Sequence, residues 1–504
     1  MKKIDIPYGL MLPLAKRMVL FLFITASWAS HAGQQEPVVK ITFLQLNDVY
    51  EMSSVNGDQG GLARVATLRK QLLAQNPHTF TVLAGDLFSP SAIGTAEVAG
   101  ERLAGEQMVA LMNELGLDYA TLGNHEFDIK EGQFLNRLSE SKFMWLSSNI
   151  FDSNNQMFPK VLSNTVFEVK KAKGTVRIGM FGLGINPNKP GFVSYVDYLK
   201  AARGQVKELR SRVDILVALT HQTLEEDIRL ANEVPEIDLI LGGHEHDNIL
   251  LHRGQKLTPI AKADANARSV FVHELSFNTK QHQLKIDSRL IPVNDKLHAD
   301  SGLSTSVQHW RSLAFAAFKK QGVDPEIEVA HLQAAFDGRE TSVRNRPTAL
   351  TELIAKSMLT AVPGAELAIF NSGMIRIDDV IGPGPVTGYD VIRIMPFGGR
   401  IMSVNMTGAV LKQTLDQGQM NIGGGGYLQS ANVAWNDRDK HWLIHEKPLE
   451  PNYEYRVAIN DFLLSGREQG LGFLTRDNTG VKVVAEQGEL RINLIKYLMF
   501  NTTK

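Results

Sequence analysis

Short apolar runs alternate with longer amphipathic stretches from Val38 to about Pro292. Such runs indicate β-strands, and the stretches between them indicate helices. The runs that we expect to be strands are Val39–Leu46, Thr79–Leu83, Tyr119–Leu122, Val176–Leu183, Ile215–Leu219 and Leu239–Leu241. The alternation is typical of an α/β fold with a sheet that is covered on both faces.

The pattern changes near residue 300. Between Ser301 and Gln321 the apolar residues recur at near-helical spacing, which predicts a linking helix. A second α+β segment follows, with strands expected at Leu367–Asn371 and Tyr455–Ile459. We therefore divide the chain into a first domain at residues 38–298, a linking helix at 299–324 and a smaller C-terminal domain at 325–504.

The N-terminus has the layout of a secretory signal peptide. A basic start is followed by an apolar run from Met18 to Ala26 and by small residues that end at Ala32. The run is short for a bilayer span, and no later stretch approaches about 18 apolar residues. We expect residues 1–32 to be removed near Ala32, which makes the protein periplasmic or secreted, without a stable membrane anchor.

Composition narrows the functional classes. The chain has 504 residues, 53 basic and 54 acidic, and its hydrophobic share of 43% is ordinary for globular proteins. Loss of residues 1–32 would leave a net charge of about −4, so no basic surface for nucleic acid is expected. Because the chain contains no cysteine, a metal would have to be held by His, Asp, Glu, Asn or Gln.

Potential metal ligands follow five of the predicted strands. Open α/β sheets place their functional sites at the carboxyl ends of strands, so these side chains should converge. Any one of them alone is more often a turn residue or a structural histidine. The candidates are Asp48, Asp86, Asn124 with His125, His221, and the pair His244 and His246.

A carboxylate between two groups of nitrogen and oxygen donors is what a two-metal centre requires. Imidazole and carboxylate donors without thiolate suit Zn, Mn, Co or Fe rather than Ca. Glycines such as Gly85 and Gly123 at the strand ends would allow tight turns close to the ions.

With these motifs the sequence resembles the 5'-nucleotidase family of calcineurin-like metallophosphoesterases. The most specific match is Gly-Asn-His-Glu-Phe-Asp at 123–128, and the resemblance extends from Asn47 to Phe462. It implies an N-terminal four-layer α/β sandwich and a smaller C-terminal α+β domain. It also implies that His125 is the catalytic imidazole, oriented by Asp128. The implied ligands of two divalent ions are Asp48 and His246 for one, Asn124, His221 and His244 for the other, and Asp86 between them.

The residue at position 50 departs from the family pattern. Relatives usually have His two residues after the first aspartate, whereas this chain has Tyr50. A neutral phenol is a poor ligand, so the site of Asp48 and His246 should bind its ion more weakly or favour a more oxophilic ion. The alternative is that Tyr50 simply packs nearby and lies outside the coordination shell.

The resemblance implies that the C-terminal domain reads the substrate. Arginines would contact its polar part, two aromatic rings would stack on its base, and the matching residues are Arg344, Asn371, Arg376, Phe397 and Phe462. For each phenylalanine alone, core packing would be the simpler interpretation. Glu468 replaces the Asp that relatives carry after the second aromatic residue, which affects contact with the nucleoside.

These features predict an exported phosphoesterase with two divalent ions that hydrolyses nucleoside 5'-monophosphates or related esters. The alternatives are a 2',3'-cyclic-nucleotide phosphodiesterase, another small-ester phosphatase, and, from a different class, a non-catalytic periplasmic binding protein or a surface adhesin. The partner is expected to be a small molecule and not nucleic acid. The pattern of residues does not determine the oligomeric state.

Overall fold

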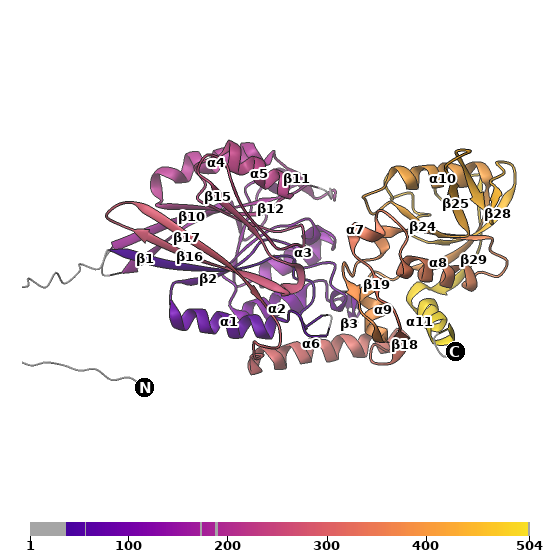
Figure 1. Cartoon of the computed structure of the whole chain (residues 1–504), viewed down its shortest axis with the longest axis horizontal. Helices are drawn as coiled ribbons and strands as arrows, with labels where there is room; N and C mark the ends of the chain where they lie inside the picture. Colours follow the sequence, from indigo (N-terminus) through magenta and orange to yellow (C-terminus); the bar gives the residue numbers. More distant parts are fainter. Residues whose placement is uncertain (1–36, 56, 172–173, 187–189, 502–504) are drawn as a thin grey trace, which may run out of the picture.

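The computed structural model describes residues 37–55, 57–171, 174–186 and 190–501. The expected signal segment at residues 1–32 lies outside these ranges. In the described part of the chain, no helix combines the length and the apolar character that a membrane crossing requires. Two bodies are joined by a long helix that runs along one side of the first body (Figure 1).

The first body contains a seven-stranded sheet. Its centre is parallel, and β1 pairs with the antiparallel strand β16 on one side. The order across the sheet is β17 (Gln283–Pro292), β16 (Ser269–Asn278), β1 (Val38–Leu46), β2 (Thr79–Leu83), β5 (Tyr119–Thr121), β6 (Met144–Leu146) and β8 (Val161–Leu162).

A six-stranded sheet packs against the first. Its parallel centre lies between the antiparallel edge strands β14 and β9. The order is β14 (Ile249–Arg253), β15 (Thr258–Lys262), β13 (Leu239–Gly242), β12 (Ile215–His221), β10 (Gly174–Gly184) and β9 (Asn164–Lys171). The six strands expected from the apolar runs are all present, with small differences at their ends.

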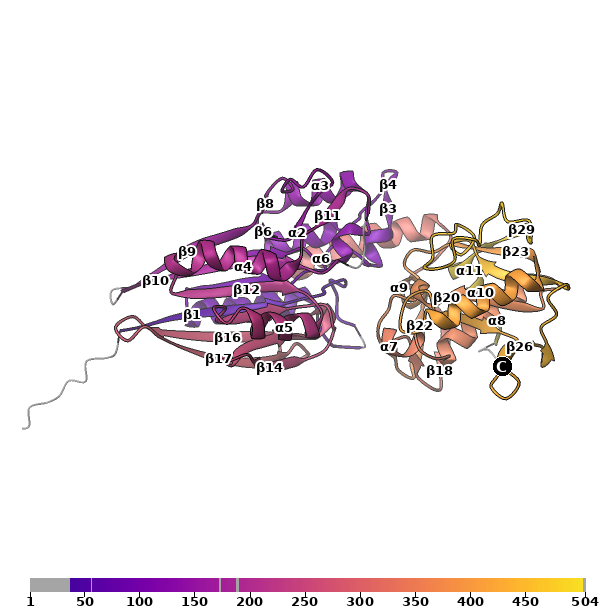
Figure 2. The same cartoon turned by 90° about the horizontal axis from the view of Figure 1, so that it is seen from above.

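The two sheets bury a shared core between their inner faces. Ile41 and Phe43 of β1 lie in one apolar cluster with Ile178 of β10, Val217 of β12 and Leu241 of β13. The expected α/β fold with a sheet covered on both faces is confirmed, but the second sheet, and not a layer of helices, covers one face of each sheet. Each sheet packs one face against the second sheet and its opposite face against helices. Its strands are therefore buried on both sides. This is the four-layer α/β sandwich that the family resemblance implied. Its layers are stacked from top to bottom in Figure 1, and Figure 2 looks down on one outer layer of helices.

Helices form the two outer layers. On the six-stranded sheet, α4 and α5 cover the outer face through an apolar cluster that includes Leu199, Leu216 and Leu230. The other helices pack on the seven-stranded sheet and on one another. The helices are α1 (Leu62–Gln75), α2 (Glu106–Leu115), α3 (Glu131–Glu140), α4 (Tyr198–Leu209), α5 (Leu224–Glu233) and α6 (Ser301–Lys320).

Helix α6 leads from the sandwich to the second body. It begins at Ser301 and is capped by Asp300, whose carboxylate accepts a hydrogen bond from the backbone N–H of Leu303 at 3.1 Å. Its buried face carries Phe315 and Phe318, which share one apolar cluster with residues of both bodies. The linking helix thus also serves as packing surface between the two bodies.

The second body is an α+β domain built on a five-stranded sheet. The order of this sheet is β24 (Leu428–Ala431), β20 (Leu367–Asn371), β28 (Glu454–Asn460), β23 (Arg400–Thr407) and β29 (Val481–Glu489). Its helices are α7 (Glu340–Val343), α8 (Ala349–Ala361), α9 (Gly388–Ile394), α10 (Gly408–Met420) and α11 (Leu490–Asn501). Short strands form small sheets, among them β18 (Glu328–Leu332) with β22 (Gly384–Thr387) and β19 (Phe336–Asp337) with β21 (Val380–Ile381).

Candidate metal centre and active site

The polar residues that follow the strands of both sheets meet at one buried point. Nε2 of His221, at the end of β12, lies 3.2 Å from Oδ2 of Asp86 and 4.0 Å from Oδ1 of Asp48. Nε2 of His221 is also 3.2 Å from Oδ1 of Asn124. The side chains of Asp48, Asp86 and His221 are essentially inaccessible to solvent. The sequence separates these residues widely, and the face-to-face sheets bring them together.

This arrangement suits a metal ion. One ligand atom from each of Asp48, Asp86 and His221 lies within 4.8 Å of the others. Metal–nitrogen and metal–oxygen bonds of about 2.0–2.2 Å leave neighbouring ligands roughly 3 Å apart. The distances of 3.2 Å from Nε2 of His221 to Asp86 and to Asn124 agree with this spacing. Burying two carboxylates costs free energy unless positive charge compensates them. The donor set therefore fits a divalent ion.

The two histidines after β13 complete the cluster. The backbone N–H of His244 donates to Oδ2 of Asp48 at 2.9 Å, and its ring lies edge-on to that of His221. Burial, and next the neighbouring His221, lower the pKa of His244 to about 3, so that the ring is neutral, as a ligand must be. Nε2 of His246 lies 3.2 Å from Oδ1 of Asp48.

Tyr50 places its hydroxyl among these groups. The phenol oxygen lies 3.1 Å from Oδ1 of Asp48, 3.0 Å from Oδ2 of Asp86 and 3.1 Å from Nε2 of His246. Burial raises the pKa of Tyr50 well above its usual value, and the charges of Asp86 and Asp48 raise it further. The hydroxyl thus lies between the expected ligands of the first ion. Its distances to these three groups fit hydrogen bonds, and they also fit the separation of ligands around one shared ion.

The backbone turns sharply at this point. Asp48, Asp86, His244 and His246 have positive φ angles of 53°, 61°, 89° and 55°. Residues other than glycine are uncommon in this region, and they concentrate at functional sites. Glycine is required beside them: a Cβ on Gly123 would lie 2.2 Å from Oδ1 of Asp86.

His125 lies next to Asp86 in the short 3₁₀ turn η2 (His125–Phe127). Its backbone N–H donates to Oδ1 of Asp86 at 2.9 Å, and its Nδ1 lies 2.6 Å from Oδ2 of Asp128. Burial lowers the pKa of His125, but the carboxylates of Asp128 and Asp86 outweigh this effect and raise it overall. The expected pair of His125 and Asp128 is therefore a hydrogen-bonded unit beside the carboxylate cluster.

Glu126 holds the Asp86 turn, a role that the sequence did not suggest. Its carboxylate accepts hydrogen bonds from the backbone N–H groups of Asp86 at 3.0 Å, Leu87 at 2.5 Å and Gly123 at 2.6 Å. Burial, and then the charge of Asp86, raise the pKa of Glu126 to about 7. Its place in the motif at 123–128 was the signal that could have revealed it.

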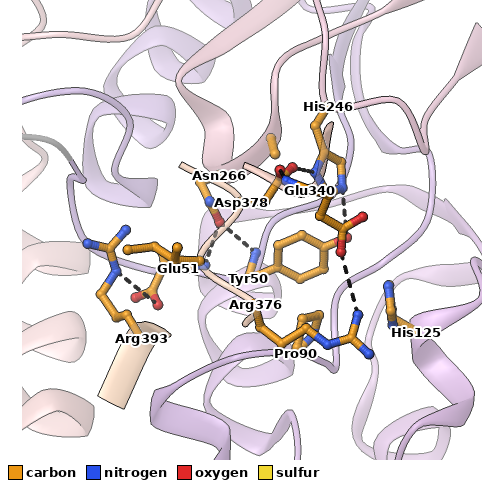
Figure 3. A pocket seen from close by; sticks show the side chains of 12 residues that line it. Tyr50, Glu51, Pro90, His125, His246, Asn266, Glu340, Arg376, Asp378 and Arg393 are labelled. Carbon is orange, nitrogen blue, oxygen red and sulfur yellow. Dashed lines mark hydrogen bonds and ion pairs between the residues drawn. The ribbon is translucent and has the colours of Figure 1, made fainter. Parts of the chain in front are cut away.

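A narrow cavity of about 20 Å³, room for a single water molecule, lies between the sandwich and the C-terminal domain. The sandwich contributes Tyr50, His125 and His246 to its lining, and the C-terminal domain contributes Glu340 and Arg376 (Figure 3). The C-terminal domain therefore faces the carboxylate cluster directly.

The two arginines expected to read the substrate lie together in this domain. Arg344 forms an ion pair with Oε1 of Glu340, and Nη1 of Arg376 lies 3.6 Å from the same oxygen. The guanidinium group of Arg376 also stacks on Phe397, 5.7 Å from the ring centre. Phe397 is 39% exposed and lines a neighbouring cavity of about 410 Å³ with Phe88.

The remaining candidates lie apart from these cavities. Nδ2 of Asn371 donates to Oε2 of Glu468 at 2.9 Å, so the residue that departs from the family holds a predicted contact residue in place. Phe462 is 37% exposed, and Arg467 stacks on it. Within the described part of the chain, neither cavity is lined by Asn371, Phe462 or Glu468. The pairing of Phe397 and Phe462 around a base stays a prediction.

Comparison with known proteins agrees with this arrangement. Residues 41–248 match the model of the calcineurin-like phosphoesterase family, and residues 328–474 match that of the 5'-nucleotidase C-terminal domain. The chain combines the two domains of the 5'-nucleotidase family. The order of these domains is the one that the motifs indicated.

Relatives and solved structures extend the comparison. The chain is 26% identical to protein UshA of Yersinia enterocolitica over 89% of each chain. It is 27% identical to the trifunctional nucleotide phosphoesterase protein YfkN of Bacillus subtilis, over 80% of this chain but only 31% of that protein. A 5'-nucleotidase precursor from Thermus thermophilus superposes with a TM-score of 0.74 at 21% identity, covering 92% of this chain and 97% of that one. The last likeness shows a shared fold.

Proposed function

We propose that this chain is a metal-dependent phosphoesterase that removes phosphate from nucleoside 5'-monophosphates or related small esters. The observation that carries the proposal is the buried cluster of Asp48, Asp86 and His221 beside the pair of His125 and Asp128. Relatives named 5'-nucleotidase and nucleotide phosphoesterase support the same class of reaction.

The donor set supports a centre for two divalent ions, with Zn, Mn, Co or Fe suited to its chemistry. Such ions supply a more acidic water and neutralise phosphoryl oxygens. Asp86 is suited to lie between the two ions because its Oδ2 faces Tyr50 on one side and His221 on the other. The proposed ligands are Asp48 and His246 for one ion, Asn124, His221 and His244 for the other, and Asp86 for both.

His125 is proposed as the group that assists departure of the leaving oxygen. Asp128 engages Nδ1, which orients the ring and leaves Nε2 for the substrate. The carboxylate of Asp128 raises the pKa of His125 and so favours the protonated ring, the form that can donate a proton to the leaving alkoxide.

The arginines beside the cavity are proposed as the polar contacts of the substrate. Arg344 and Arg376 share Glu340 here, and a phosphate or ribose oxygen would compete with that carboxylate for their N–H groups. Phe397 is exposed beside Arg376 and could stack on a base, and Phe462 is proposed to cover its other face. Asn371, held by Glu468, is proposed to contact the nucleoside.

A phosphate-release assay over a panel of esters tests the proposal. The purified protein is assayed with nucleoside 5'-monophosphates, 2',3'-cyclic nucleotides and sugar phosphates, and each divalent ion is added in turn. Asp86→Asn should abolish release, whereas Asp287→Asn, which changes an exposed carboxylate on β17, should leave it intact. The preferred ester decides between a nucleotidase, a cyclic-nucleotide phosphodiesterase and another small-ester phosphatase.

Two outcomes would contradict the proposal. Tight binding of nucleotide without release under any ion would favour the non-catalytic binding protein. Release that persists in Asp86→Asn would place the chemistry elsewhere. Binding of nucleotide without release is disfavoured by the hydrogen-bonded pair of His125 and Asp128, which a pure binding protein does not need.

We also propose that the protein is exported and acts on small molecules outside the cytoplasm. The support is the layout of residues 1–32 in the sequence. Fractionation of expressing cells, followed by N-terminal sequencing of the exported protein, should give a chain that begins just after Ala32. An intact N-terminus in the cytoplasmic fraction would contradict export.

A further inference from the structure

Asp378 of the C-terminal domain reaches across to a histidine of the sandwich. Its Oδ2 lies 2.5 Å from Nδ1 of His246, which is 132 residues away in the sequence. Figure 3 shows the contact at the edge of the narrow cavity, beside Glu340. The two residues come from different bodies of the molecule.

The other nitrogen of the same ring faces the carboxylate cluster. Nε2 of His246 lies 3.2 Å from Oδ1 of Asp48 and 3.1 Å from the hydroxyl of Tyr50. His246 is thus held at both nitrogens, one toward the expected ion and one toward a carboxylate. Histidine ligands usually donate the second N–H in this way, which fixes the tautomer and the ring orientation and strengthens the ligand.

Asp378 is itself fixed by its own domain. Its Oδ1 accepts a hydrogen bond from the backbone N–H of Glu340 at 2.7 Å, and its backbone has a φ of 38°. The Glu340 carboxylate pairs in turn with Arg344 and Arg376. The aspartate therefore presents its second oxygen to His246 from a rigid position.

His221 provides a contrast within the same centre. Its Nδ1 lies 2.8 Å from the backbone carbonyl oxygen of Ala84, so its orientation depends on the sandwich alone. Adjacent contacts hold the two bodies together where Asp378 crosses. Nη1 of Arg268 lies 2.9 Å from Oδ1 of Asp379, and the hydroxyl of Tyr389 donates to Oε2 of Glu51 at 2.7 Å.

We propose that Asp378 is a positioning residue of the metal centre, a carboxylate that the C-terminal domain supplies to orient the ligand His246. The centre is then complete only while the two bodies are in contact as they are here. The inference rests on the proposed function to the extent that His246 binds an ion. It goes further, because it makes ion affinity a property of both domains.

Titration with Mn²⁺ alone tests the proposal on the full-length protein, with free ion measured by its electron paramagnetic resonance signal. Asp378→Asn keeps the shape of the side chain and removes its charge, and Asp378→Ala removes both oxygens. The matched control is Asp379→Asn, which weakens the neighbouring contact with Arg268 and leaves the contact between Asp378 and His246 in place. Thermal unfolding in the presence of a chelator reports whether each variant folds.

The expected result is that Asp378→Asn binds one ion roughly 10–100-fold more weakly, the usual effect of losing such a partner. Asp378→Ala should lose at least as much, and Asp379→Asn should stay within about twofold of the wild type. Wild-type affinity in Asp378→Ala would overturn the proposal. An equal loss in Asp379→Asn would also overturn it, because the effect would then belong to domain contact in general.

The same samples separate this proposal from the proposed function. Phosphate release is measured beside the titration. A wild-type protein that releases no phosphate but loses Mn²⁺ affinity in Asp378→Asn would disprove the phosphoesterase and support the role of Asp378. An active wild type with unchanged Mn²⁺ affinity in both Asp378 variants would support the phosphoesterase and disprove the role of Asp378.

Discussion

The hydroxyl of Tyr50 lies 3.1 Å from Nε2 of His246. Because His246 is an expected ligand of the first ion, the side chain at position 50 should affect how tightly that ion binds. A phenol must lose its proton to bind an ion well, whereas an imidazole need not. We therefore expect the wild type to need added metal for full activity, and Tyr50→His to bind metal more tightly.

Activity titrated against free metal for Tyr50→His and Tyr50→Phe checks this prediction. Phenylalanine keeps the ring and removes the oxygen that contacts Asp48, Asp86 and His246, so it is the matched control. If both variants follow the wild-type curve, the hydroxyl plays no part in metal binding.

His125 should act on chemistry and not on metal content. Replacement by Asn should lower kcat by roughly 10²–10⁴, the usual contribution of a general acid or base. Elemental analysis should find as much metal in His125→Asn as in the wild type. Asp128→Asn should lower kcat less, because it removes the partner of Nδ1 and keeps the imidazole. Parallel loss of metal and rate would instead make His125 a ligand.

The buried lysine behind the metal centre should be critical for stability. Nζ of Lys262 donates to the carbonyl oxygens of Gln222 at 2.6 Å and Gly243 at 2.8 Å, and it pairs with Asp227 and Glu245. Burial lowers the pKa of Lys262, but the two carboxylates raise it above its usual value.

Lys262→Met should cost about 3–5 kcal/mol of unfolding free energy, because it leaves carboxylates buried without their partner. Urea unfolding with a chelator present gives the value. Lys70→Met, which removes an exposed ion pair with Asp300, should cost far less. A similar loss of unfolding free energy in both variants would show that the buried ion pairs of Lys262 contribute no more to stability than an exposed pair.

His273 should make the fold sensitive to acid. It is fully buried on β16, where its Nε2 contacts Oε1 of Gln45 at 2.9 Å, and burial lowers its pKa to about 3. The unfolded chain binds a proton near pH 6.5 and the folded chain does not. Stability should therefore fall as the pH drops from about 6.5 toward 3, by about 1.4 kcal/mol per pH unit.

Unfolding free energies of the wild type and His273→Gln at several pH values, with a chelator present, check this dependence. Glutamine can keep a hydrogen bond to Gln45 but cannot take up a proton. The slope below pH 6.5 should be smaller in the variant by about one proton. Equal slopes would show that His273 does not contribute.

The strand ends were predictable from the sequence because each ligand directly follows an apolar run. Asp48 comes two residues after Leu46, and His244 three residues after Leu241, so local patterning places them. The sequence did not reveal that β1 and β12 belong to different sheets, because a strand buried between two sheets and a strand buried under helices have the same apolar pattern.

Contacts across the two bodies were also hidden. Asp378 and His246 are linked through the packing of the C-terminal domain on the sandwich, and no local spacing signals such a pair. Lys262 and Glu340 pair within their own bodies, but they were missed as well, because their partners Asp227 and Arg376 are distant in the sequence. A buried charge is recognised as structural only when its neighbours in space are known.

The left-handed backbone at Asp48, Asp86, His244 and His246 has a cost that the apolar core must offset. A residue other than glycine in this region typically costs about 1 kcal/mol or more. Glycine would relax the strain at each position and remove an expected ligand at the same time. Substitutions that relax the backbone at these positions would therefore remove the centre, so a copy released from selection for activity can become more stable while it loses its ligands.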